Sequence, residues 1–172
     1  MTFELKNLDA EHPYLLKDRG LDPKTVEEFG LGHCSRGLMN NRVVIPVHDE
    51  HGQLVAYAGR WPAAVVPEDE PKYMVPPNWQ KSLVLFNFHR ALEEAQEKRG
   101  LIVVEGFFAL FRLWQAGYRN VVALMGNELY QAQTHLLQAA LGEFGRVTLM
   151  LDNDAGGKTC EEQCVETLVS SM

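Results

Sequence analysis

Residues 146–158, with the sequence RVTLMLDNDAGGK, constrain the fold of this chain more than any other stretch. A short run of β-branched and aliphatic residues at 147–151 predicts a strand that is buried on both faces. The run stops at Asp152 and Asp154, which are followed by Ala155 and two glycines. We therefore expect two carboxylates at the carboxyl end of a buried strand, the edge at which open α/β sheets bind ligands.

Two interpretations of this acidic pair remain open from the residues alone. Carboxylates this close repel each other unless a cation lies between them, and Mg²⁺ is a hard ion that takes oxygen ligands. The same residues also suit a plain turn between a strand and a helix, because Asp, Asn and Gly all favour turns and helix caps.

Regular alternation of strands and helices follows Gly100. The pattern predicts strands at residues 101–104, 120–124 and 147–151, and helices at residues 107–116, 129–141 and 159–169. Strands that alternate with helices of this length form parallel sheets with right-handed crossovers. We therefore predict an α/β fold whose parallel sheet has flanking helices.

The first hundred residues have a different, mixed character. They suggest two short helices within 14–29, a hairpin of strands 43–47 and 54–57, an irregular crossing at 61–77, a strand at 83–86 and a polar helix at 90–99 ended by Gly100. This indicates a smaller α+β subdomain over residues 1–100, followed by the parallel-sheet domain over residues 101–172.

Composition narrows the class of protein. The chain has 172 residues, 46% of them hydrophobic, and a formal net charge of −7, so any contact with a phosphate backbone has to be local. No apolar run of about 20 residues could span a bilayer, and the N-terminus lacks a signal-peptide pattern, which predicts a cytoplasmic protein without a membrane partner. The three cysteines give neither an even disulfide framework nor a CxxC pair.

A third acid follows the first strand of the alternating region. Residues 101–106 read LIVVEG, so Glu105 is expected at the same sheet edge as Asp152 and Asp154. Gly106 allows backbone or ligand to approach closely. Three carboxylates then converge on one position.

Two longer stretches carry a family resemblance. VVEGFFALFRLWQAGYRNVVALMGNELYQAQ followed by LDNDAGGK resembles the Toprim domain, which has a strand ending in Glu-Gly and another ending in Asp-x-Asp. Upstream, YLLKDRGLDPKTVEEFGLG, NRVVIPVHDEHGQLVAYAGR and PKYMVPPNWQKSLVLFN are similar, in the same order, to the RNA-polymerase core of bacterial replicative DNA primases. The resemblance implies a Toprim-like sheet preceded by a primase-like subdomain.

The resemblance also implies residue roles and partners. It makes Glu105, Asp152 and Asp154 the catalytic and metal-site acids for Mg²⁺ or Mn²⁺. A template- or nucleotide-facing strip would comprise Arg42, Arg60, Lys72, Tyr73 and Lys81. The implied activity is metal-dependent nucleotidyl transfer from NTPs on single-stranded DNA. For each basic residue the alternative is a solvated surface charge, and for Tyr73 a packed aromatic ring.

Several positions depart from the family pattern. Ala109 stands where the primase pattern has an Asp, Val75 where it has an Asn, and Asn127 where it has a Thr. The later acidic motif and fourth strand are not found before Met172, so the Toprim domain is expected to be incomplete at its C-terminus. These departures suggest two alternatives. A protein partner supplies the missing primase parts, or the chain is a non-catalytic module that binds nucleic acid or a partner.

Two rival enzyme classes fit less well. Residues 152–159, DNDAGGKT, approach a phosphate-binding loop, but that loop needs Gly where Asp152 stands, and its carboxylates would repel the phosphates. A Toprim nuclease would use similar acids, and the primase-like upstream half argues against it.

Overall fold

The computed structural model describes residues 4–142 and 144–171 and divides into two compact units. The first unit contains residues 1–47 and 54–79, and the second contains residues 48–53 and 80–172. The α2 helix (Phe88–Lys98) packs on α4, β5 and β6 of the second unit, so the compact units divide near Gln80, upstream of Gly100. Within the described residues, no helix is both long and apolar enough to cross a bilayer.

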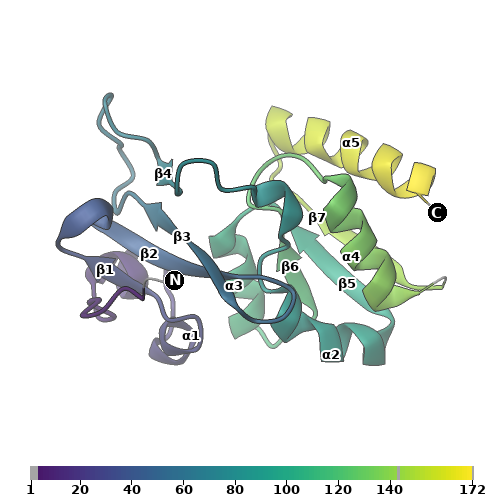
Figure 1. The fold of residues 1–172 in the computed structure, drawn as a ribbon, viewed down its shortest axis with the longest axis horizontal. Coiled ribbons are helices and arrows are strands. Elements are labelled where there is room, and N and C mark those ends of the chain that lie inside the picture. Colours follow the sequence, from purple (N-terminus) through teal and green to yellow (C-terminus); the bar gives the residue numbers. More distant parts are fainter. Residues whose placement is uncertain (1–3, 143, 172) are drawn as a thin grey trace. The chain divides into compact units, whose positions relative to one another are not determined.

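The first unit is built on a small sheet with strand order β1-β2-β3-β4 (Figure 1). The strands are β1 (Gly32–Cys34), β2 (Arg42–His48), β3 (Leu54–Arg60) and β4 (Tyr73–Met74). A π-helical turn η1 (Tyr14–Asp18), the helix α1 (Pro23–Glu28) and a 3₁₀ turn η2 (Gly37–Met39) accompany them. Asp22 caps α1 because its side chain accepts a hydrogen bond from the Thr25 backbone N–H, and Pro23 lies in the first turn.

The second unit is the predicted three-stranded parallel sheet, with strand order β6-β5-β7 (Figure 1). Its elements are η3 (Lys81–Leu83), α2, β5 (Gly100–Val104), α3 (Phe107–Gln115), β6 (Val121–Ala123), α4 (Gln131–Leu141), β7 (Arg146–Met150) and α5 (Ala155–Ser171). The connections β5-α3-β6 and β6-α4-β7 run in opposite directions across the sheet. Right-handed crossovers therefore place α3 and α4 on opposite faces.

The core of this unit fills the face of the sheet that carries α2, α4 and α5. Leu101 and Val103 of β5 are buried there with Leu137 of α4 and with Cys160 and Cys164 of α5. Val104 points to the other face because side chains alternate along a strand. The two cysteines are packed residues of one helix, with free thiols.

Two local predictions were wrong. The strand at 147–151 was expected to be buried on both faces, but β7 lies at the edge of the sheet and alternates between exposed and half-buried residues. Residues 83–86 do not form a strand: η3 occupies the start, and only Phe86 pairs, through a single antiparallel bridge to Ala123. Both predictions depend on how many strands pair with the segment. The sequence does not reveal this number, because it is set by the tertiary structure.

Two histidine rings lie close together in the second unit. The rings of His48 and His89 lie 5.2 Å apart, and the Nδ1 atom of each is buried without a hydrogen-bond partner among the described residues. Burial and then the charge of Arg90 lower the pKa of His89 from 6.5 to about 4. Burial and Arg90 also lower the pKa of His48.

We therefore expect the free energy of unfolding to fall as the pH drops from about 6.5 towards about 4. The unfolded chain takes up the His89 proton first in this window, which favours unfolding. His89→Gln should flatten the pH dependence of urea unfolding between these values, whereas His135→Gln, an exposed change on α4, should leave it as it is. An unchanged slope in His89→Gln would contradict the assignment.

Candidate functional site at the carboxyl edge of the parallel sheet

Two adjacent parallel strands bring Glu105 and Asp152 together. β5 and β7 pair in register up to Val104 and Met150, so the residues that follow them emerge at the same edge. The backbone N–H of Asp152 donates a hydrogen bond to Glu105 Oε1 over 3.1 Å. The two residues are 47 positions apart in the sequence, and the contact follows from strand order.

Asp154 completes the acidic edge while starting the next helix. Its Oδ1 accepts the backbone N–H of Gly157 over 2.8 Å, and its carbonyl oxygen accepts the N–H of Lys158. Asp154 therefore caps α5, and the turn interpretation of this motif is correct for that residue. A carboxylate has further lone pairs, so capping leaves Asp154 able to bind a cation.

The electrostatics of the edge show that the three acids interact. Burial raises the pKa of Glu105, the negative charges of Asp152 and Asp154 raise it further, and the hydrogen bond from the Asp152 amide opposes them. Asp152 and Asp154 are exposed and Glu105 is half-buried. A cation at this edge would favour the ionised form of Glu105 by offsetting the two like charges.

The donor set fits a hard divalent cation. All three side chains offer carboxylate oxygens, the ligands that Mg²⁺ and Mn²⁺ prefer. Among the described residues, no group of three His, Cys, Asp or Glu side chains is placed to hold a metal ion, so Glu105, Asp152 and Asp154 share this edge without forming a preformed ligand set. Mg²⁺ usually keeps several waters and is bound through one or two carboxylates together with substrate phosphates.

Lys81 is the one residue of the predicted basic strip that belongs to the second unit, and it lies at this same edge. Its Nζ occupies the space beside Gly126, 2.7 Å from where a Cβ on that glycine would stand. Gly126 follows β6, and the neighbouring Met125 amide bonds to the Glu105 carbonyl oxygen over 2.9 Å. A lysine and three acids therefore occupy the edge formed by the carboxyl ends of the three strands.

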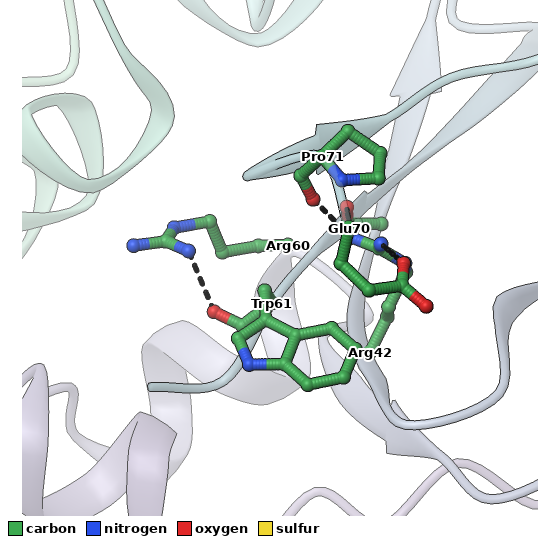
Figure 2. A network of polar contacts seen from close by, with 6 residues as sticks. Arg42, Arg60, Trp61, Glu70 and Pro71 are labelled. Carbon is green, nitrogen blue, oxygen red and sulfur yellow. Dashed lines mark hydrogen bonds and ion pairs between the residues drawn. The ribbon is translucent and has the colours of Figure 1, made fainter. Parts of the chain in front are cut away.

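Arg42 is buried inside the first unit, unlike a surface-strip residue. Its side chain is 1% exposed and pairs with Glu70 over 2.6 Å (Figure 2). Its Nη1 donates to the carbonyl oxygens of Pro71 at 2.9 Å and Gly59 at 3.3 Å, and its guanidinium lies over the Trp61 ring. These contacts hold the segment before β4 against β3, so Arg42 stabilises the conformation of this region.

Arg60, Tyr73 and Lys72 form the rest of the predicted strip. Arg60 is 3% exposed, donates to the Trp61 carbonyl oxygen over 2.6 Å and lies over the Tyr73 ring. Tyr73 is half-buried, and Lys72 next to it is exposed. Of these three residues, only Lys72 is exposed enough for its side chain to reach a phosphate without rearrangement of the structure.

Gly157 packs closely against the acidic edge. The sequence showed only that two glycines follow the acids and did not predict this packing. Gly157 is buried in the first turn of α5. A Cβ there would overlap the Asp152 carbonyl oxygen and come within 2.9 Å of Glu105 Oε1. Only glycine lets α5 start this close to the acids.

We therefore expect Gly157→Ala to displace the acidic loop. Overpacking of this kind costs about 1–3 kcal/mol, and the displaced acids should also bind Mn²⁺ more weakly. Gly156→Ala is the matched control: its added Cβ meets only the flexible Asp154 carboxylate at 3.3 Å, so stability should stay level or rise. Thermal unfolding and Mn²⁺ titration measure both effects, and equal behaviour of the two variants would contradict this packing.

Comparison with protein families gives two matches along the chain. Residues 99–171 match the Toprim domain, and residues 36–92 match the N-terminal domain of the DNA primase catalytic core. The matches follow each other in the order expected from the sequence motifs.

Individual proteins agree with these matches. The chain is 30% identical to the DNA primase of Aquifex aeolicus over 97% of its own length and 39% of that protein. The crystal structure of the zinc-binding and RNA polymerase domains of the Aquifex aeolicus primase superposes with a TM-score of 0.79 at 30% identity, covering 91% of this chain and 46% of that one. The DnaG primase catalytic domain bound to single-stranded DNA shares the fold, with a TM-score of 0.78 at 22% identity over 95% of this chain and 62% of that one.

The chain thus spans less than half the length of the Aquifex aeolicus primase. The matched part includes the acidic sheet edge and part of the preceding small unit. The chain therefore contains a Toprim domain and the N-terminal domain of the DNA primase catalytic core, and it is homologous to the RNA-polymerase core of DNA primases.

Proposed function

We propose that this chain performs primase-type chemistry, the metal-dependent joining of NTPs into RNA on a single-stranded DNA template. The observation that carries the proposal is the hydrogen bond between Glu105 and the Asp152 amide, which joins two strand ends at the acidic edge. A related catalytic domain is known bound to single-stranded DNA. Such an enzyme would act in the cytoplasm, with a protein partner where further primase parts are needed.

The roles of the residues follow from their positions. Glu105, Asp152 and Asp154 would hold Mg²⁺ or Mn²⁺, which when bound neutralises triphosphate charge and polarises the reacting phosphoryl group. Lys81 would contact the triphosphate from the same edge. The 3′-hydroxyl oxygen would attack the α-phosphorus and give up its proton to water, the bond between the α-phosphorus and the oxygen that bridges to the β-phosphate would break, and pyrophosphate would leave.

The basic residues of the first unit have separate roles in this proposal. Lys72 would contact the template backbone, and Tyr73, backed by Arg60, would offer an aromatic face to a base. Arg42 would maintain the geometry of this strip from within. A direct test is synthesis of oligoribonucleotides on single-stranded DNA with NTPs and either Mg²⁺ or Mn²⁺. Absence of product with both metals would count against catalysis.

A non-catalytic binding module is the second candidate, and the specific observation in its favour is Ala109. This residue in α3 stands where the primase pattern supplies a further acid. A binding module predicts salt-sensitive binding of single-stranded DNA that survives Asp152→Ala and weakens with Lys72→Ala. Loss of binding only in the aspartate variant would exclude it.

A further inference from the structure

The amino edge of the parallel sheet carries basic residues, in contrast to the acidic carboxyl edge. Lys98 and Arg99 precede β5, Arg119 precedes β6, and Arg146 begins β7. Because the three strands are parallel, these residues share one edge. In a chain of net charge −7 this concentrates positive charge at one place.

A cavity of about 310 Å³ lies at this edge. Its lining includes Lys98, Gly100, Ile102, Tyr118, Asn120 and Arg146. Asn120 is buried and donates its side-chain N–H to the Gly100 carbonyl oxygen over 2.8 Å. The Ile102 amide donates to the Asn120 carbonyl oxygen over 2.8 Å. These bonds fix the β6 entry against β5 and give the cavity a rigid wall.

The strand register explains why the space is open. Gly100 is the partner of Arg146, and Ile102 is the partner of Thr148, so these four residues share the face opposite the α4 core. Arg146 and Thr148 are exposed on the edge strand. Gly100 has no side chain, which leaves space beside Arg146. A Cβ added at Gly100 would fill this space at ordinary contact distances, 3.5 Å from the Arg146 carbonyl oxygen and 3.7 Å from the Lys98 carbonyl oxygen.

The basic side chains around the cavity differ in whether they already contact another residue of the protein. Lys98 lies in the last turn of α2 and pairs with Glu94, and a cation there also stabilises the helix C-terminus. Arg119 stacks on Trp114. Arg146 starts a strand instead of ending a helix, and its guanidinium has no hydrogen-bond or ion-pair partner among the described residues. Tyr118 is 48% exposed and presents an aromatic ring at the rim.

We propose that this cavity binds a mononucleotide. The phosphate would face Arg146, which offers a planar fork of donors, with Lys98 as a second charge. The base would stack on Tyr118, and the volume lies at the lower end of the range for small-ligand pockets. Gly100 and Glu105 lie at opposite ends of β5, roughly 16 Å apart at about 3.3 Å per residue, so this site is separate from the acidic edge.

Calorimetric titration of the full chain with adenosine 5′-monophosphate, in low salt and with EDTA, tests the proposal. Without divalent ions the acidic edge repels phosphate, so binding reports the amino edge. We expect saturable binding that weakens by about tenfold or more in Arg146→Ala, since charge-assisted hydrogen bonds are lost. Gly100→Ala should also weaken binding by narrowing the cavity without changing the charge.

Controls separate this site from general electrostatics and from the proposed catalysis. Lys24→Ala removes one exposed charge from α1 of the first unit, and Asp152→Asn alters the acidic edge; both should bind the nucleotide as the unaltered chain does. Circular dichroism verifies folding of each variant. Absence of saturable binding, equal loss in Lys24→Ala, or binding of inorganic phosphate as tight as that of the nucleotide would overturn the assignment.

Discussion

Asp152→Asn is expected to lower the proposed metal-dependent RNA synthesis by about 100-fold or more. The substitution keeps the size of the side chain and leaves the Asp152 backbone N–H free to bond Glu105. It removes one of the carboxylates that would hold the cation, and the charge stabilisation from a metal is worth several kcal/mol, at about 1.4 kcal/mol for each tenfold change in rate. Steady-state incorporation of labelled NTPs on single-stranded DNA measures the effect.

The structure supplies a matched control for this prediction. Glu166→Gln makes the same change of charge at an exposed position on α5, away from the acidic edge, and should retain synthesis. Mn²⁺ titration provides a second measurement that does not depend on activity, with weaker binding expected in Asp152→Asn only. Full activity in the aspartate variant, or equal loss in both variants, would rule out the proposed role.

Arg42→Ala is expected to destabilise the first unit by about 2–3 kcal/mol. The buried guanidinium satisfies the carbonyl oxygens of Gly59 and Pro71 and pairs with Glu70 (Figure 2). Removing it takes the donor from the buried Gly59 carbonyl oxygen, which costs about 1–3 kcal/mol for a buried group left unsatisfied, and it also removes the packing of the guanidinium on Trp61. Arg42→Lys should recover only part of the loss, because an ammonium cannot reproduce the planar fork.

Two comparisons sharpen the Arg42 prediction. Glu70→Gln should cost less, because the Glu70 side chain is 37% exposed and water can replace the ion pair. Arg36→Ala, an exposed change on the same unit, should be close to neutral. Urea unfolding followed by tryptophan fluorescence in a Trp114→Phe background reports the first unit, since the remaining Trp61 and Trp79 lie in it and Trp61 contacts the Arg42 guanidinium. A loss below about 0.5 kcal/mol for Arg42→Ala would show that its contacts do not stabilise the fold.

The parallel sheet and its acidic edge could be predicted because they depend on local patterns and one topological rule. Each strand is a short apolar run, each helix has its own boundary signals, and parallel strands place their carboxyl ends together. Glu105 and Asp152 could therefore be assigned to one edge although 47 residues separate them. The role of Asp154 as a helix cap also follows from local chemistry.

Burial could not be predicted in the same way. The residues of β7 are as apolar as those of a central strand, and only the strand order reveals that β7 is an edge strand. Arg42 looks like any surface arginine in the sequence, because its partner Glu70 is 28 residues away in a loop. The proximity of Lys81 to Gly126 is likewise a contact between distant segments.

The sequence by itself determined the class of fold, the family and the sheet edge shared by Glu105 and Asp152, because the alternation of elements, the strand ends and the order of motifs are properties of short segments. Tertiary structure decided which charges are exposed and which are buried, that Gly157 must lack a side chain, and that a cavity opens beside Arg146. The physical reason is that desolvation, ion pairing and close packing depend on neighbours brought together from distant parts of the chain.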